Sequence, residues 1–213
     1  MTCLPVYRSA LICAEQETTR RGEIKEQVLR ILLNYPDGSL SKYRIWKLSE
    51  GSQTWVYDFI KILEEEEYLN DTRVTDPLGL FDYWAENRVT PGEKHYTVRN
   101  PMQLLEDVER EYALTTYRAE NLVQSHLFPS RTDIYCKAGD LEYWHSLLGK
   151  KGLVGGGNFR TLYGSDHVFF RSSRVQGYTV VSTPQLIVDL LVEGGPCVEA
   201  AEMLIEKYVA ENV

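Results

Sequence analysis

From Glu23 onward the chain reads EIKEQVLRILLN (23–34), PDGS (36–39), LSKYRIWKLSE (40–50), GSQ (51–53), TWVYDFIKILEEEEYL (54–69) and NDTRV (70–74). These pieces predict a helix, a turn, a short helix, a second turn, a longer helix and the start of a two-stranded hairpin. That order is typical of a winged helix-turn-helix, a fold whose usual role is to read double-stranded DNA. The sequence therefore predicts such a module in the first half of the chain.

The predicted helices have clear apolar faces and start signals. Apolar residues recur at helical spacing, at Ile24, Val28, Ile31 and Leu32 in the first helix, Ile45 and Leu48 in the second, and Val56, Phe59, Ile60 and Leu63 in the third. Ser41 and Ser52 are natural N-caps for the second and third helices, and Gly51 separates them. The remaining residues of the third helix should then face outward.

That outward face carries the side chains that a DNA-reading helix needs. Gln53 can bond adenine, and Thr54 can meet a base edge or a thymine methyl group. Tyr57 and Lys61 can hold phosphates, although Asp58 suits this face poorly. The residues expected to contact DNA are Lys42, Arg44, Ser52, Gln53, Thr54, Tyr57, Lys61 and Arg73.

The wing is expected to follow the third helix. Residues 68–75 alternate like a strand, residues 76–79 read as a turn, and residues 80–89 can return as the second strand. Arg73 and Arg88 would then reach flanking phosphates or the minor groove.

Charge gives only weak support for nucleic-acid binding. The 213-residue chain has a formal net charge of −8, which is unusual for a dedicated nucleic-acid binder. Residues 20–63 carry eight Lys and Arg against five Asp and Glu, a local net charge of +3. Phosphates respond to charge within about 8 Å at physiological salt. The local distribution therefore permits DNA contact, while winged helices that dock protein remain the alternative.

The second half of the sequence predicts a mixed α/β region that follows a linker at residues 90–101. His95 lies in this linker, and we expect it to be exposed and without a catalytic role. A helix starts at Met102. Strands are expected at residues 112–115, 132–137, 159–163, 168–171 and 178–181, and helices at 117–124, 140–148, 183–192 and 198–209. The fold class predicted is α+β, with residues 1–92 forming the winged helix and residues 93–213 the second domain.

The segments ALTTYRAENL (113–122) and TDIY (132–135) resemble the opening of a nucleotidyltransferase-like fold. In active members a Gly-Ser pair holds nucleotide phosphates and two alternating carboxylates hold the metal ions. Thr115 and Thr116 stand where the pair would be, while Asp133 fills the first acid position and Tyr135 the second. The resemblance therefore implies a domain without a catalytic site.

Other candidate sites are weaker. A rival placement on the glycines at 155–157 and Asp166 also fails, because Val168 takes its second acid position, and those glycines read as a flexible turn. No GxSxG motif presents a nucleophilic serine. The four cysteines, Cys3, Cys13, Cys136 and Cys197, show no metal-ligand spacing and suggest buried, reduced thiols. We expect no catalytic residue, metal or cofactor.

Taken together with VVSTPQLIVDLL (180–191) and VEAAEMLIEK (198–207), the segment SKYRIWKLSEGSQTWVYDFIKILEEE (41–66) resembles the AbiEi family of antitoxins and related archaeal transcriptional regulators. The resemblance implies a DNA-binding autoregulator of a two-gene system, not an enzyme, whose C-terminal half opposes a toxin or carries dimer contacts. Expected partners are double-stranded DNA, a cognate toxin and a second copy, with no membrane. No apolar run reaches the length of a membrane span, and we expect a cytoplasmic protein. An adaptor that docks protein is the alternative, and nucleotidyl transfer is the disfavoured third reading.

Overall fold

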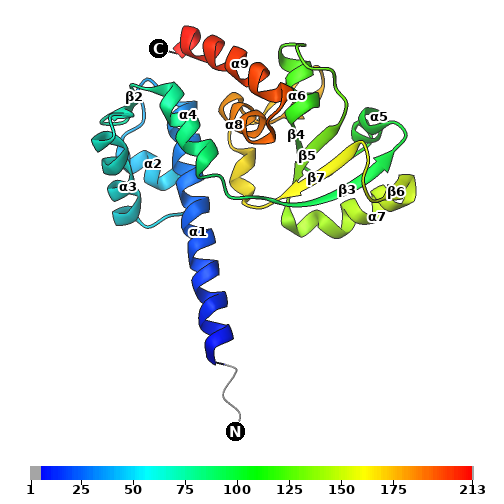
Figure 1. The fold of residues 1–213 in the computed structure, drawn as a ribbon, viewed down its shortest axis with the longest axis horizontal. Helices are drawn as coiled ribbons and strands as arrows, with labels where there is room; N and C mark the ends of the chain where they lie inside the picture. Colours follow the sequence, from blue (N-terminus) through cyan, green and yellow to red (C-terminus); the bar gives the residue numbers. More distant parts are fainter. Residues whose placement is uncertain (1–5, 213) are drawn as a thin grey trace.

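A computed structural model describes the backbone of residues 6–212 and the side chains of residues 20–212. The protein is α+β, with N-terminal helices, a seven-stranded mixed sheet with interspersed helices, and C-terminal helices (Figure 1). We call the first part the helical unit; its elements are α1 (Val6–Asn34), α2 (Lys42–Leu48), α3 (Gln53–Glu65), β1 (Leu69–Asn70), β2 (Arg73–Val74) and α4 (Pro77–Glu86). The first half of α1 projects away from the rest of the molecule (Figure 1).

The remaining elements form the sheet unit. Its strands are β3 (Gly92–Val98), β4 (Tyr112–Thr115), β5 (Thr132–Cys136), β6 (Gly152–Val154), β7 (Phe159–Tyr163), β8 (Ser173–Val175) and β9 (Tyr178–Val180). Its helices are α5 (Pro101–Glu106), α6 (Thr116–Val123), α7 (Leu141–Lys151), α8 (Thr183–Glu193) and α9 (Pro196–Asn212), with short 3-10 turns η1 (Ala138–Asp140) and η2 (Asp166–Phe169). The strand order is β6-β3-β7-β5-β4-β9-β8, with β4 antiparallel to β5 and β5 parallel to β7. None of the described helices is long and apolar enough to span a bilayer.

The predicted starts of the second and third helices are confirmed. The hydroxyl of Ser41 accepts a hydrogen bond from the backbone N–H of Arg44, and that of Ser52 accepts from Trp55. The four apolar residues predicted for the third helix are all buried along α3. The first helix, however, begins at Val6, well before the predicted start at Glu23.

The predicted second wing strand is wrong, because residues 77–86 form helix α4. Asp76, expected within a turn, caps this helix by accepting a hydrogen bond from the N–H of Gly79 at 3.0 Å. Pro77 stands at the first helical turn, where its missing N–H costs nothing. Leu80, Phe81 and Trp84 are buried on one face of this helix. The apolar side chains that were assigned to a strand therefore belong to a helix. The hairpin is reduced to two residues in each strand.

The predicted linker at residues 90–101 is also wrong, because β3 lies inside the sheet between β6 and β7. Tyr96 and Val98 are buried on one face of β3, whereas Glu93 and Lys94 are exposed and give the segment its polar composition. The predicted strand at residues 168–171 is wrong as well, since residues 166–169 form η2 and residues 170–171 form a turn before β8. Polar composition hid the strand β3, whereas at residues 168–171 the short apolar run VFFR was misread as a strand.

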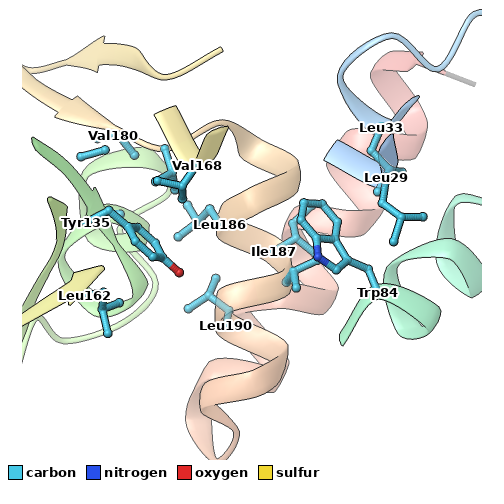
Figure 2. Packing of buried hydrophobic residues seen from close by; sticks show 14 of the residues in the cluster. Leu29, Leu33, Trp84, Tyr135, Leu162, Val168, Val180, Leu186, Ile187 and Leu190 are labelled. Atoms are coloured by element: carbon cyan, nitrogen blue, oxygen red, sulfur yellow. The ribbon is translucent and has the colours of Figure 1, made fainter. Parts of the chain in front are cut away.

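Helix α8 is the centre of the core. Its residues from Pro184 to Leu190 are all buried, as expected for a helix that is covered on every side. Ile187 faces Trp84 of α4 and the helix α1, while Leu186 and Leu190 point toward the sheet (Figure 2). The helical unit and the sheet therefore pack on opposite sides of α8.

Two cysteines, Cys136 and Cys197, are buried free thiols, as predicted. Burial raises the pKa of Cys136 to about 12. Such a thiol stays protonated and unreactive at neutral pH. The side chains of Cys3 and Cys13 lie outside the described residues.

Candidate nucleic-acid interface

The outer face of α3 carries most of the residues that the sequence assigned to DNA. Gln53, Thr54 and Lys61 are exposed, and Tyr57 is half-buried beside them. The side-chain amide of Gln53 donates a hydrogen bond to the hydroxyl of Tyr57 at 3.2 Å. The structure thus brings these four side chains together on one exposed surface, next to the capped start of the helix at Ser52.

The basic residues around α3 fall into two groups. Lys42 lies 2.8 Å from Glu64 and 3.3 Å from Asp71, and Lys61 lies 3.4 Å from Glu65. The hydrogen bond to Glu64 is the main reason why the pKa of Lys42 is raised. Each of these lysines must leave a carboxylate, or share it, before it can bind a phosphate. Lys42 and Lys61 are therefore less available to a phosphate than a cation without a carboxylate partner.

Arg44 and Arg73 form the second group. Both are exposed, and no carboxylate among residues 20–212 lies within salt-bridge distance of either guanidinium. Lys47 is similar, with its ammonium 3.9 Å from the ring centroid of Trp46. These cations come from α2 and from the hairpin strand β2, on either side of α3 in the sequence.

Arg88 does not belong to this surface, which corrects the expectation that it reaches DNA. Its guanidinium is buried, forms an ion pair with Glu26 of α1, and lies 2.9 Å from Asp189 of α8. It also donates to the hydroxyl of Tyr135 at 2.7 Å. The side chain follows α4 rather than a wing strand, so it points into the junction between the helical unit and the sheet unit.

Sequence reasoning missed this junction and the second arginine within it. Arg30 is only 2 % exposed and donates to Gln185 at 2.8 Å and to His167 at 3.0 Å. Its carboxylate partner, Glu26, precedes it by one helical turn on α1. The i, i+4 spacing of Glu26 and Arg30 is a signal in the sequence that they pair, but in the prediction from sequence they contribute only to the local charge of residues 20–63.

The Asp133 carboxylate lies in a second cluster, at the start of β5. Asp133 is 0 % exposed, and both of its oxygens accept hydrogen bonds from Arg131 and from Arg160, at 2.6 to 3.2 Å. The hydroxyl of Thr116 donates to the same carboxylate. Glu193 accepts hydrogen bonds from Nη2 of both arginines, at 2.7 and 2.8 Å, and each of these nitrogens also binds Asp133. Although burial opposes this, the two arginines lower the pKa of Glu193.

Tyr135, the residue in the second acid position, has a different partner. Its hydroxyl donates to Asp189 at 3.0 Å, and burial raises its pKa well above the usual range. A cavity of about 370 Å³ lies between the two clusters, and Arg88, Thr116, Tyr135, Arg160, Asp189 and Glu193 line part of its wall. The polar atoms of these side chains are already bound, to one another or, for Thr116, to Asp133.

No group of three or more His, Cys, Asp or Glu side chains in residues 20–212 is arranged to hold a metal ion. Comparison of the chain with models of protein families, with curated proteins and with solved structures finds no match. The α3 surface and the Asp133 cluster are therefore the two features of the molecule from which a function can be inferred.

Proposed function

We propose that this protein is a DNA-binding transcriptional regulator whose sheet unit is a non-catalytic, nucleotidyltransferase-like domain. The observation that carries the proposal is the exposed face of α3, where Gln53, Thr54, Tyr57 and Lys61 lie together. Helix α3 enters the major groove in this reading, and its first turn meets the base edges. Arg44 and Arg73 hold phosphates on either side.

The proposal for the sheet unit draws on its topology and on Asp133. Thr115 and Thr116 lie at the junction of β4 and α6, beside Asp133 on the neighbouring strand β5. This is the relative placement that the resemblance to nucleotidyltransferases implies. Two guanidiniums occupy both oxygens of Asp133, and Tyr135 replaces the second acid. In-line phosphoryl transfer needs carboxylates that are free to bridge two metal ions. The arrangement therefore favours a scaffold over an enzyme.

A regulator with these two parts suits the role of an autorepressor and antitoxin, as the AbiEi-like segments imply. In that role α3 recognises the promoter of its own gene pair, and the sheet unit meets a cognate toxin or a second copy of the chain. Paired copies would bind paired half-sites about one helical turn apart.

Protein docking is the second candidate, and two observations favour it. Lys42 and Lys61 already have carboxylate partners. Tyr43 and Ile62 are 51 % and 49 % exposed on α2 and α3. Both features suit a protein partner better than a phosphate backbone.

The deciding experiment is a fluorescence anisotropy titration of labelled double-stranded DNA from the gene's own promoter, at about 50 and 200 mM salt. We expect binding that weakens with salt and resists random competitor DNA. Arg44→Glu should abolish binding, whereas the matched charge reversal Lys207→Glu, on α9, should leave it unchanged. Absence of binding at the lower salt would overturn the DNA proposal in favour of docking.

A separate variant tests base reading and a separate assay tests catalysis. Gln53→Ala should lower discrimination between promoter and random DNA by roughly 1–3 kcal/mol, the value of a bidentate base contact. Undiminished discrimination would remove Gln53 from that role.

Metal-dependent consumption of a nucleoside triphosphate that disappears in Asp133→Ala would contradict the proposal that the sheet unit is non-catalytic.

A further inference from the structure

The turn between α2 and α3, residues 49–52, is held by side chains from outside that turn. Gln27 of α1 accepts a hydrogen bond from the backbone N–H of Glu50 at 2.8 Å and donates to the Glu50 carboxylate at 3.2 Å. The indole of Trp46 donates to the carbonyl oxygen of Gly51 at 3.1 Å. This turn sets the direction in which α3 leaves α2.

The sheet unit also reaches this turn, through His167 of η2. Nε2 of His167 lies 3.1 Å from the carbonyl oxygen of Leu48, the last residue of α2. Nδ1 lies 3.0 Å from the guanidinium of Arg30. A guanidinium can only donate, so Nδ1 accepts and the ring proton sits on Nε2, which donates to Leu48. The contacts on both nitrogens therefore select one neutral tautomer.

The position of His167 is itself fixed by buried partners. Its ring stacks on Phe170 with centroids 5.0 Å apart. Arg30, which binds Nδ1, is anchored to Gln185 at the centre of α8. A parallel connection runs from Ser165, whose hydroxyl lies 3.4 Å from the amide nitrogen of Gln27. Leu48 and Gln27 are thus each tied to η2, which is more than 110 residues away in the sequence.

We propose that Ser165 and His167 are positioning residues for α3, so that the sheet unit sets the geometry with which the helix-turn-helix reads DNA. The inference rests on the proposed DNA-binding function. Gln53 and Thr54 lie in the first turn of α3, directly after the held turn, so a rotation of that turn moves them first. Side chains that read base edges must be held within about 0.5 Å by the shell around them.

His167→Phe tests the proposal, because phenylalanine keeps the stacked ring and removes both hydrogen bonds. His167→Gln is the conservative partner, since its amide nitrogen can still donate to Leu48. His145→Phe is the matched control; His145 bonds Tyr96 from α7 in the sheet unit and has no contact with the turn. Ser165→Ala breaks the second connection and serves if His167→Phe does not fold.

The main readout is the indole N–H resonance of Trp46 in a nitrogen-15 correlation spectrum, assigned with Trp46→Phe. We expect His167→Phe and Ser165→Ala to shift this resonance, and His167→Gln and His145→Phe to leave it in place. In the anisotropy assay, His167→Phe should lose about tenfold in preference for promoter over random DNA, comparable to one mismatched base pair. Its binding to random DNA should be preserved.

The positioning role of Ser165 and His167 and the proposed DNA binding can be overturned independently of each other. An unchanged Trp46 resonance in folded His167→Phe and Ser165→Ala overturns the positioning role, whatever the protein binds. Undiminished promoter preference in His167→Phe overturns it too. If the wild-type protein binds no DNA, the proposed function is overturned, whereas a shifted Trp46 resonance still supports control of the turn by His167.

Discussion

The guanidinium of Arg88 lies 2.9 Å from Oδ1 of Asp189, and this contact joins the end of the helical unit to the middle of α8. Glu26 of α1 binds the same guanidinium, and Tyr135 of β5 accepts from it. One buried cation therefore meets three elements that are far apart in the sequence. Charged groups in such a site are costly unless every one of them has a partner.

Replacing Arg88 by methionine should destabilise the protein by roughly 3–5 kcal/mol, because Glu26 and Asp189 would remain buried with a missing cation. Equilibrium unfolding in urea measures this as a lower midpoint. Lys61→Met is the matched control, since its pair with Glu65 is exposed and should contribute about 0.5 kcal/mol or less. A loss for Arg88→Met no larger than that of the control would show that Arg30 and the remaining hydrogen-bond donors satisfy Glu26 and Asp189 without this cation.

Acid should weaken the protein through His167. Burial, with the nearby charge of Arg30, lowers the pKa of His167 to about 4, below the value of about 6.5 expected in the unfolded chain. The unfolded state therefore takes up the proton first as pH falls. The stability that the neutral His167 contributes is therefore complete above about pH 6.5 and is lost as the pH falls toward 4.

His167→Gln isolates this effect, because glutamine does not titrate. Between about pH 7 and pH 5, the free energy of unfolding of the wild-type protein should fall by about 2 kcal/mol more than that of the variant. Denaturant titrations of both proteins across this range supply the comparison. Parallel pH profiles would mean that His167 is not held in its neutral form.

Thr116→Val should lower the free energy of unfolding by roughly 1.5–3 kcal/mol. The substitution keeps the shape of the side chain and removes the hydroxyl that donates to the buried carboxylate of Asp133. Thr90→Val, at an exposed position, is the control. Thermal unfolding of the two variants should differ clearly, and equal melting temperatures would mean that the two arginines alone satisfy Asp133.

The sequence predicted those parts of the fold whose signals are local. Helices α2 and α3, their serine caps, and strands β4, β5 and β7 follow from spacing and capping residues within each segment. Strand β3 could not be found in this way. In the sheet, Glu93 pairs with Leu162 of β7, and the residues near Glu93 in the sequence do not indicate this partner.

The candidate site, like the fold, could be predicted from the sequence only in part. The outward residues of α3 follow from helical periodicity, so their common surface was predictable. The buried charges were not, because Arg30 and Arg88 look like ordinary surface residues until α1, α4 and α8 come together. Misassigning α4 as a strand also moved Arg88 to the wrong surface.

Glu64→Gln should increase affinity for DNA, which distinguishes the DNA reading from protein docking. Glu64 holds Lys42 at 2.8 Å, and its loss both removes a negative charge near α3 and frees the ammonium from its strongest partner, although Asp71 stays 3.3 Å away. One additional phosphate contact would steepen the dependence of log K on log salt by about 0.9. Anisotropy titrations at several salt concentrations measure both effects. In a Lys42→Ala background the gain should shrink to the part that comes from the removed negative charge, without the steeper salt dependence, and Glu202→Gln, on α9, should produce no gain. Affinity that stays constant or falls would mean that Lys42 does not meet phosphate, and that its pairing with Glu64 belongs to a surface made for a protein partner.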